Sequence, residues 1–214
     1  MTAAVICMPV ERFVAPEAAN SFAGVYGQGL VDGTVIGRTM NGHTLLDRAR
    51  NLLVVEALKL PNRPTHIFWM DSDMLVPPGA VAQLAAHDRP IVGGLWHLKL
   101  PPFKPCAYRY AQDGEFQLID LPDNPHGLVP VDGMGLSATL VRMDVYTAMQ
   151  ERYGDDLWHA FRDEAGEDVH FFKRAQEMGY EAWIDTDLRC GHMRREAIWT
   201  DDYEAFRHAT ELAP

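Results

Sequence analysis

The chain has 214 residues, of which 47% are hydrophobic and 23% are charged, so we expect a soluble globular protein with one domain over residues 1–214. Its formal net charge of −11 argues against broad nucleic-acid binding, because affinity for phosphate backbones comes from clustered Lys and Arg. No apolar run is long enough to span a bilayer, and the start lacks the basic region of a signal peptide. The three cysteines are scattered without metal-ligand spacing, so we expect a cytoplasmic protein with reduced thiols.

Strands and helices alternate over the first half of the chain. The expected order is a strand at 3–8 that Pro9 ends, a helix at 16–26, a strand at 29–38, a helix at 44–60 capped by Thr44, a strand at 67–70, a helix at 77–87 and a strand at 91–96. Such alternation predicts parallel strands joined by right-handed crossovers.

The pattern changes after residue 100. Segments 104–110 and 115–119 flank Asp113-Gly114, and this pattern predicts a β-hairpin. A loop is expected at 121–130. The remaining elements are expected to be a strand at 135–141, a helix at 144–153, a helix at 168–178 ended by Gly179, a strand at 181–185 and a tail helix at 201–211. The predicted fold class is therefore α/β, with a mostly parallel central sheet flanked by helices and a small β-hairpin insertion.

A buried strand that ends in two acids organises the chain. Residues 67–70 are all apolar, as expected of a strand covered on both faces, and Asp71 and Asp73 follow directly. Ligands of open α/β sheets bind beyond the carboxyl ends of the strands, and two carboxylates on one side of an extended segment suit Mg²⁺ or Mn²⁺. The alternative is that these acids only turn the chain into the helix that begins near Pro77.

Two further features lie on a helix and between strands. Arg50 follows Ala49 and precedes Asn51 on the predicted helix 44–60, where an arginine is ordinarily a solvated or ion-paired surface residue. Asn51 is less common in mid-helix, because its side chain competes with helical hydrogen bonds. Gly133 and Gly135 separate two predicted strands, and they fit either a close backbone approach to a ligand or a simple bulge.

Two more features come late in the chain. Glu167 and Asp168 open a helix, where acids are common as caps; in a functional role one carboxylate would act as a general base, kept ionised by the helix dipole and backbone N–H groups. His192 follows the last predicted strand beside Gly191, and this placement singles it out among the nine histidines, although any one His is more often a surface or core residue.

The order of these features resembles the GT-A glycosyltransferases, and most of all the family-2-like branch that uses nucleotide-sugar donors. The resemblance spans residues 5–192, and its most specific segments are 68–73 and 166–179. It implies the GT-A, or nucleotide-diphospho-sugar transferase, fold. It also implies a glycosyltransferase of the hexosyl- or related-transferase class, which moves a sugar from a nucleotide-diphosphate donor to a hydroxyl of an acceptor glycan, protein or small molecule.

The resemblance also assigns roles to individual residues. Asp71 and Asp73 match the family's Asp-x-Asp motif, with Asp73 the more direct metal ligand and Asp71 near the metal or the ribose, and His192 matches the late histidine that completes metal coordination. For donor binding, the resemblance places Arg50 near the donor nucleotide. It places residues 9–12, including Pro9 and Arg12, at the border of the nucleobase. Gly133 and Gly135 are placed with the donor site, and Asp168 or Glu167 supplies the base. The implied cofactor is Mn²⁺ or Mg²⁺, with imidazole favouring Mn²⁺.

The chain departs from fuller family members in lacking a Gln-x-x-Arg-Trp motif after the helix that Glu167 and Asp168 open; Lys173-Arg174 is not followed by Trp. Transfer of a single sugar is therefore favoured over processive polymerisation. Two alternatives remain: a nucleotidyltransferase on a related fold, against which residues 8–16 contain no Gly to cradle phosphates, and a catalytically inactive sugar-nucleotide or glycan-binding module. Whether the reaction retains or inverts the anomeric configuration stays open.

Overall fold

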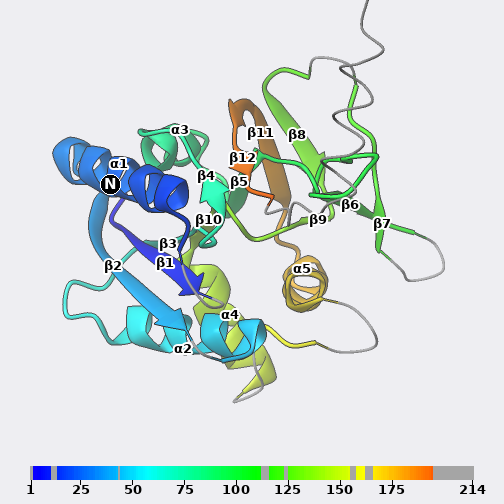
Figure 1. The fold of residues 1–214 in the computed structure, drawn as a ribbon. Helices are drawn as coiled ribbons and strands as arrows, with labels where there is room; N and C mark the ends of the chain where they lie inside the picture. Colours follow the sequence, from blue (N-terminus) through cyan, green and yellow to red (C-terminus); the bar gives the residue numbers. More distant parts are fainter. Residues whose placement is uncertain are drawn as a thin grey trace, which may run out of the picture.

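The computed structural model describes residues 2–10, 14–42, 44–111, 116–122, 125–154, 158–161 and 166–194. Its centre is a seven-stranded sheet in the order β2-β1-β3-β10-β5-β11-β8 (Figure 1). In that order the strands are β2 (Val35–Gly42), β1 (Ala4–Val10), β3 (His66–Trp69), β10 (Thr139–Arg142), β5 (Ile91–Leu95), β11 (Ala182–Arg189) and β8 (Leu128–Val131).

Five of these strands run in one direction, which confirms the expected mostly parallel sheet. Strand β1 pairs in parallel with β2 and β3, and β5 pairs in parallel with β11. Strand β10 lies antiparallel between β3 and β5, and β8 lies antiparallel at the edge beside β11. Because the parallel strands share a direction, their carboxyl ends meet at one edge of the sheet.

Helices cover both faces of the sheet (Figure 1). One face packs against α1 (Pro16–Asp32) and α3 (Ala80–Ala85), and the other against α2 (Leu46–Lys59), α4 (Met143–Tyr153) and α5 (Glu167–Glu177). Strand β3 contributes Ile67 and Trp69 to the second face and Phe68 to the first, where Met70 joins it, and all four are fully buried. Burial on both faces is the reason that residues 67–70 show no polar alternation.

Two small sheets lie outside the central one. Strands β7 (Phe116–Leu118), β6 (Ala107–Tyr110) and β9 (Gly133–Met134) form a three-stranded sheet, and β6 and β7 are antiparallel. This confirms the expected hairpin strands, while Asp113-Gly114 fall outside the described residues. Strands β4 (Met74–Leu75) and β12 (Gly191–His192) pair with each other and join the segment after β3 to the segment after β11.

Several boundaries differ from the sequence-based expectations. Helix α1 continues to Asp32 and ends at Gly33, whose φ is 76°, so the strand expected at 29–38 begins only at Val35. The apolar residues that suggested an earlier strand, Leu30 and Val31, are exposed on the last turn of α1. Helix α2 has Leu45 at its N-cap without a side-chain hydrogen bond, so Thr44 is not the cap. The tail helix expected at 201–211 lies outside the described residues.

Pro9 belongs to strand β1 rather than ending it, since it pairs with Asn41 of β2. The backbone N–H and C=O groups of successive β1 residues point alternately toward β2 and toward β3. Those of Cys7 point toward β3, because the carbonyl of Cys7 accepts a hydrogen bond from the amide of Met70. The nitrogen of Pro9 faces that same side, where pairing with β3 has already ended at Cys7. The missing N–H of proline therefore costs no ladder bond.

Within the described ranges, no helix has both the length and the apolar character needed to cross a membrane.

Candidate functional site

The polar residues singled out in the sequence gather at the carboxyl edge of the parallel strands. Asp71 and Asp73 follow β3, and His192 lies in β12 just beyond β11. Helix α5 leads into the start of β11, so its first residues, Glu167 and Asp168, lie at the same edge. The topology therefore unites segments that are more than a hundred residues apart in the chain.

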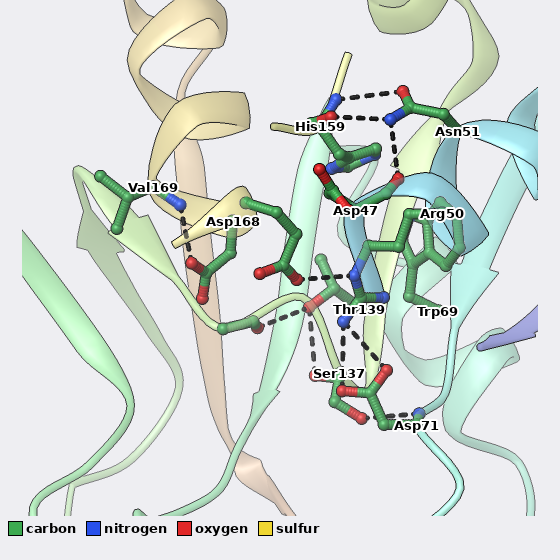
Figure 2. A network of polar contacts seen from close by, with 12 residues as sticks. Asp47, Arg50, Asn51, Trp69, Asp71, Ser137, Thr139, His159, Asp168 and Val169 are labelled. Carbon is green, nitrogen blue, oxygen red and sulfur yellow. Dashed lines mark hydrogen bonds and ion pairs between the residues drawn. The ribbon is translucent and has the colours of Figure 1, made fainter. Parts of the chain in front are cut away.

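Arg50 is the centre of a buried ion-pair network (Figure 2). Its side chain is 2% exposed, and its Nε donates to Glu167 Oε1 at 2.8 Å. Its Nη2 donates to both oxygens of Asp71, at 2.9 and 3.2 Å. The guanidinium carbon lies 5.2 Å from the centre of the Trp69 ring. One cation thus binds the helix α2, the end of β3 and the start of α5 together.

Charge and burial compete in this network. Burial alone would lower the pKa of Arg50, but Asp71 and Glu167 outweigh it and raise that pKa, so the guanidinium stays charged. Burial raises the pKa of Asp71 more than Arg50 lowers it. The backbone amide of Asp71 also donates to Ser137 Oγ at 3.0 Å. Asp71 is therefore held from two sides, with its carboxylate turned toward Arg50.

The hydrogen bonds of the Asn51 side chain explain why an asparagine occupies the middle of α2. Its Nδ2 donates to the carbonyls of Asp47 and His159, both at 2.7 Å, and its Oδ1 accepts the amide of His159 at 3.2 Å. The His159 ring is fully buried and stacks on Phe171 of α5 with 5.0 Å between ring centres. Asn51 therefore fixes the segment before α5 against α2, which supports the placement of Glu167 beside Arg50.

Asp73 lies in a separate polar group. Its Oδ2 forms an ion pair with Lys99 Nζ, and His192 Nε2 lies 3.7 Å from the same oxygen. Burial acts to raise the pKa of Asp73, but the contacts with His192 and Lys99 outweigh it and lower that pKa to about 2. Asp73 is therefore a carboxylate at any physiological pH, ready to bind a cation.

The imidazole of His192 is oriented by its surroundings. Strand β12 pairs His192 with Met74, and the amide of Met193 donates to the carbonyl of Asp73 at 2.9 Å. His192 Nδ1 lies 3.0 Å from the carbonyl oxygen of His97, which can only accept, so Nδ1 carries the proton. Nε2 is therefore the ring nitrogen that faces Asp73, at 3.7 Å from Oδ2, and a histidine whose other nitrogen is held in this way can bind a metal through it.

The three residues expected to bind a metal are not equivalent. Among the described residues, no three His, Cys, Asp or Glu side chains are grouped closely enough to hold a metal ion. Asp73 and His192 offer one oxygen and one nitrogen near each other, whereas Asp71 is engaged by Arg50. This pair has donor atoms suited to Mn²⁺ or Mg²⁺, and a bound diphosphate would have to supply further oxygens.

Asp168 differs from the acid beside it. Glu167 is buried and bonded to Arg50, while Asp168 is partly buried and its Oδ1 accepts the amide of Val169 at 2.8 Å (Figure 2). Burial and then the charge of Glu167 raise the pKa of Asp168 to about 7. The expectation that the helix start keeps this carboxylate fully ionised is therefore wrong, because desolvation and a neighbouring charge outweigh the backbone N–H group.

Three of the remaining expected donor-site residues, Gly133, Gly135 and Pro9, are packed against neighbouring parts of the structure. A Cβ on Gly135 would lie 2.2 Å from Trp96 Cζ2, and one on Gly133 would lie 3.0 Å from Phe116 Cε1. The Trp96 ring thus requires a glycine at position 135, whether or not a ligand also approaches, whereas the space at Gly133 is only tight. Pro9 is buried at the end of β1, and Arg12 is outside the described residues.

Two residues of the site escaped the sequence reasoning. Ser137 holds the amide of Asp71, and Lys99 contacts Asp73 from the segment between β5 and β6. Ser137 belongs to no recognisable motif, and Lys99 stands in a proline-rich stretch without periodicity. Only spatial proximity identifies them.

Comparisons with known proteins bear on the fold. No family model matches the chain, and no curated protein matches it. Among solved structures, A197 from STIV matches with a TM-score of 0.57 at 15% identity, over 91% of this chain and 87% of A197. The catalytic domain of Drosophila β1,4-galactosyltransferase 7, crystallised with xylobiose, matches with a TM-score of 0.53 at 14% identity, over 97% of this chain and 80% of that one. At these identities the likeness shows the fold alone, and that fold is of the glycosyltransferase GT-A type.

Proposed function

We propose that this protein is a metal-dependent glycosyltransferase that moves a single sugar from a nucleotide-diphosphate donor to an acceptor hydroxyl. The observation that carries the proposal is the meeting of three groups at one sheet edge of a GT-A-type fold. These groups are the oriented Asp73–His192 pair, the Arg50-held Asp71, and Asp168 with its pKa near neutrality.

Asp73 and His192 are the residues proposed to hold the cation. The carboxylate of Asp73 supplies charge, and His192 supplies a nitrogen whose direction is fixed by the His97 carbonyl. A mixed oxygen and nitrogen donor set favours Mn²⁺ over Mg²⁺. When bound, the cation would act as a Lewis acid that neutralises charge on the leaving nucleoside diphosphate. It would also allow a chain with a net charge of −11 to bind an anionic donor.

Asp71 and Arg50 are proposed to shape the nucleotide side of the site. Arg50 and Ser137 hold the side chain and the amide of Asp71 in place. The side chain of Asp71 nevertheless remains 26% exposed, so it can accept a hydrogen bond from the donor without reorganising. Arg50 is 2% exposed and acts through Asp71 and Glu167 as a positioning residue.

Asp168 is proposed as the general base. A carboxyl group with a pKa of about 7 is roughly half ionised near neutral pH, where a base is most effective. Its Oδ1 accepts the Val169 amide, so the other carboxyl oxygen would take the proton of the acceptor hydroxyl as that hydroxyl attacks the anomeric carbon. Such a base typically contributes about 10²- to 10⁴-fold in rate. Glu167, which is bonded to Arg50, would hold the start of α5 rather than accept the proton.

The test is a screen of nucleotide-sugars with Mn²⁺ for slow donor hydrolysis, which requires no acceptor. Asp73→Asn is expected to remove Mn²⁺-dependent donor binding, measured by calorimetry, and hydrolysis, while the circular dichroism spectrum stays unchanged. Asp187→Asn is the matched control, because Asp187 also contacts a histidine, His126 at 3.0 Å, but on an exposed surface. Donor binding that survives in Asp73→Asn as it does in the control would contradict the proposal.

A further inference from the structure

The segment between β5 and β6, residues 96–106, contacts the Asp73–His192 pair at three points. The Trp96 ring lies edge-on to His192 with 4.9 Å between ring centres, and the His97 carbonyl faces His192 Nδ1 at 3.0 Å. Lys99 Nζ contacts Asp73 Oδ2. We refer to residues 96–106 as the β5–β6 loop; it is the part of the chain that both orients the imidazole and places a positive charge on the carboxylate.

Hydrogen bonds within the β5–β6 loop fix where Lys99 stands. The amide of Leu98 donates to the carbonyl of Lys104 at 2.9 Å, and the amide of Cys106 donates to the carbonyl of Trp96 at 3.0 Å. The two arms of the loop are therefore hydrogen-bonded to each other. Lys99 follows Leu98, so it lies just beyond the hydrogen bond between Leu98 and Lys104, on the way to the tip of the loop. The long side chain of Lys99 can still move, because it is 36% exposed and has a flexible stem.

Two groups converge on one oxygen of Asp73. Lys99 Nζ and His192 Nε2 both approach Oδ2, and the Asp73 side chain is 38% exposed. A divalent cation held by Asp73 and His192 would share this single carboxylate with the ammonium group. Two cations repel each other at such short range, so metal binding weakens the Lys99–Asp73 ion pair.

The charge balance of the site gives the released ammonium a role. Arg50 is buried and already neutralised by Asp71 and Glu167, so it has no charge left for a phosphate. Lys99 is a half-exposed cation beside the proposed metal ligands, and a lysine is a flexible point charge well suited to phosphate. An ammonium that leaves Asp73 stays within reach of an anion bound to the same metal.

We propose that Lys99 binds the diphosphate of the donor and, before donor and metal arrive, occupies Asp73 in place of the cation. This inference rests on the proposed function and adds a residue to it. Its consequence is that the charge of Lys99 affects two ligands in opposite directions: it opposes binding of the metal alone and favours binding of the metal-bound nucleotide.

The experiment compares Lys99→Met with Lys104→Met. Lys104 lies in the same β5–β6 loop and pairs with Asp120 at 3.1 Å, so the control removes an equal charge from an ion pair away from Asp73. Mn²⁺ alone is titrated and followed by the electron paramagnetic resonance signal of free Mn²⁺. Binding of UDP, GDP, ADP, CDP and dTDP is then measured by calorimetry at saturating Mn²⁺. Thermal melting checks that both variants are folded.

Lys99→Met is expected to bind Mn²⁺ alone about threefold more tightly than wild type, the effect of freeing a half-exposed ion pair. It should bind the preferred nucleoside diphosphate roughly tenfold more weakly, the effect of losing a charged hydrogen bond. Lys99→Arg should restore most of the nucleotide affinity, and Lys104→Met should match wild type in both measurements.

The outcomes separate this inference from the proposed function. If wild type binds Mn²⁺ and a nucleotide, and Lys99→Met changes neither affinity or changes both in the same direction, the inference is overturned and the proposed function stands. If wild type binds neither Mn²⁺ nor any nucleoside diphosphate, both are overturned.

Discussion

The buried position of Arg50 makes Arg50→Met a sharp test of the structure. Methionine keeps much of the length of the side chain but cannot pair with the carboxylates of Asp71 and Glu167. Both ion pairs, at 2.9 and 2.8 Å, would be lost at once, and so would the contact with the Trp69 ring. We therefore expect a large loss of stability rather than a change confined to ligand binding.

The size of the stability loss in Arg50→Met depends on how well water can reach each carboxylate that has lost its arginine partner. The Glu167 side chain is 7% exposed and would bear nearly the full cost of a broken buried pair, about 3–5 kcal/mol. Asp71 is 26% exposed and regains part of its hydration, so it adds less. A loss of about 4 kcal/mol corresponds to a fall in melting temperature of roughly 10 °C for a chain of this length.

The assay is urea unfolding followed by circular dichroism at pH 7.5 and at pH 4.5. The loss of stability should shrink at the lower pH, because protonation neutralises the carboxylates that Arg50 no longer balances; burial already raises the pKa of Asp71. Arg48→Met is the control, since Arg48 lies two residues before Arg50 on α2, is exposed, and should change stability by less than about 0.5 kcal/mol. An Arg50→Met variant within about 1 kcal/mol of wild type, or one whose loss does not depend on pH, would refute the buried network.

Two further predictions concern Asp168 and Gly135. Activity of the wild type should rise with pH through about 7 as Asp168 ionises, and Asp168→Asn should lower the turnover number about 10²- to 10⁴-fold. Because its folded pKa of about 7 lies above the ordinary value of 3.8, stability is lost as pH rises between these values. The melting temperature of Asp168→Asn should therefore exceed that of wild type at pH 8 but not at pH 4, and equal differences at the two pH values would count against the raised pKa. Gly135→Ala should cost about 1–3 kcal/mol, because its Cβ would lie 2.2 Å from Trp96 Cζ2, whereas Gly37→Ala, with no atom within 4 Å, should leave the urea midpoint nearly unchanged.

The sequence indicated the fold well where local pattern and tertiary environment agree. The apolar run 67–70 predicted a strand covered on both faces, and β3 has both of its faces buried. Helix α2 was predicted from its apolar periodicity and lies where expected, to within two residues at its start. The antiparallel insertion of β10 between β3 and β5 was not predicted, because strand order depends on contacts between segments that carry no local signature.

For the candidate site, the amino-acid sequence identified which residues were candidates and in what order they occur. It identified Asp71, Asp73, Asp168 and His192 through their places after strands and at a helix start. Their different environments came from the tertiary structure, since burial, neighbouring charges and hydrogen bonds act through space. Asp71 and Glu167 are both paired with Arg50. Desolvation raises the pKa of Asp168 to about 7, and the β5–β6 loop brings Lys99 into contact with Asp73. All four acids carry the same carboxyl group, and only its surroundings decide whether it pairs with an arginine, has a raised pKa or pairs with a lysine.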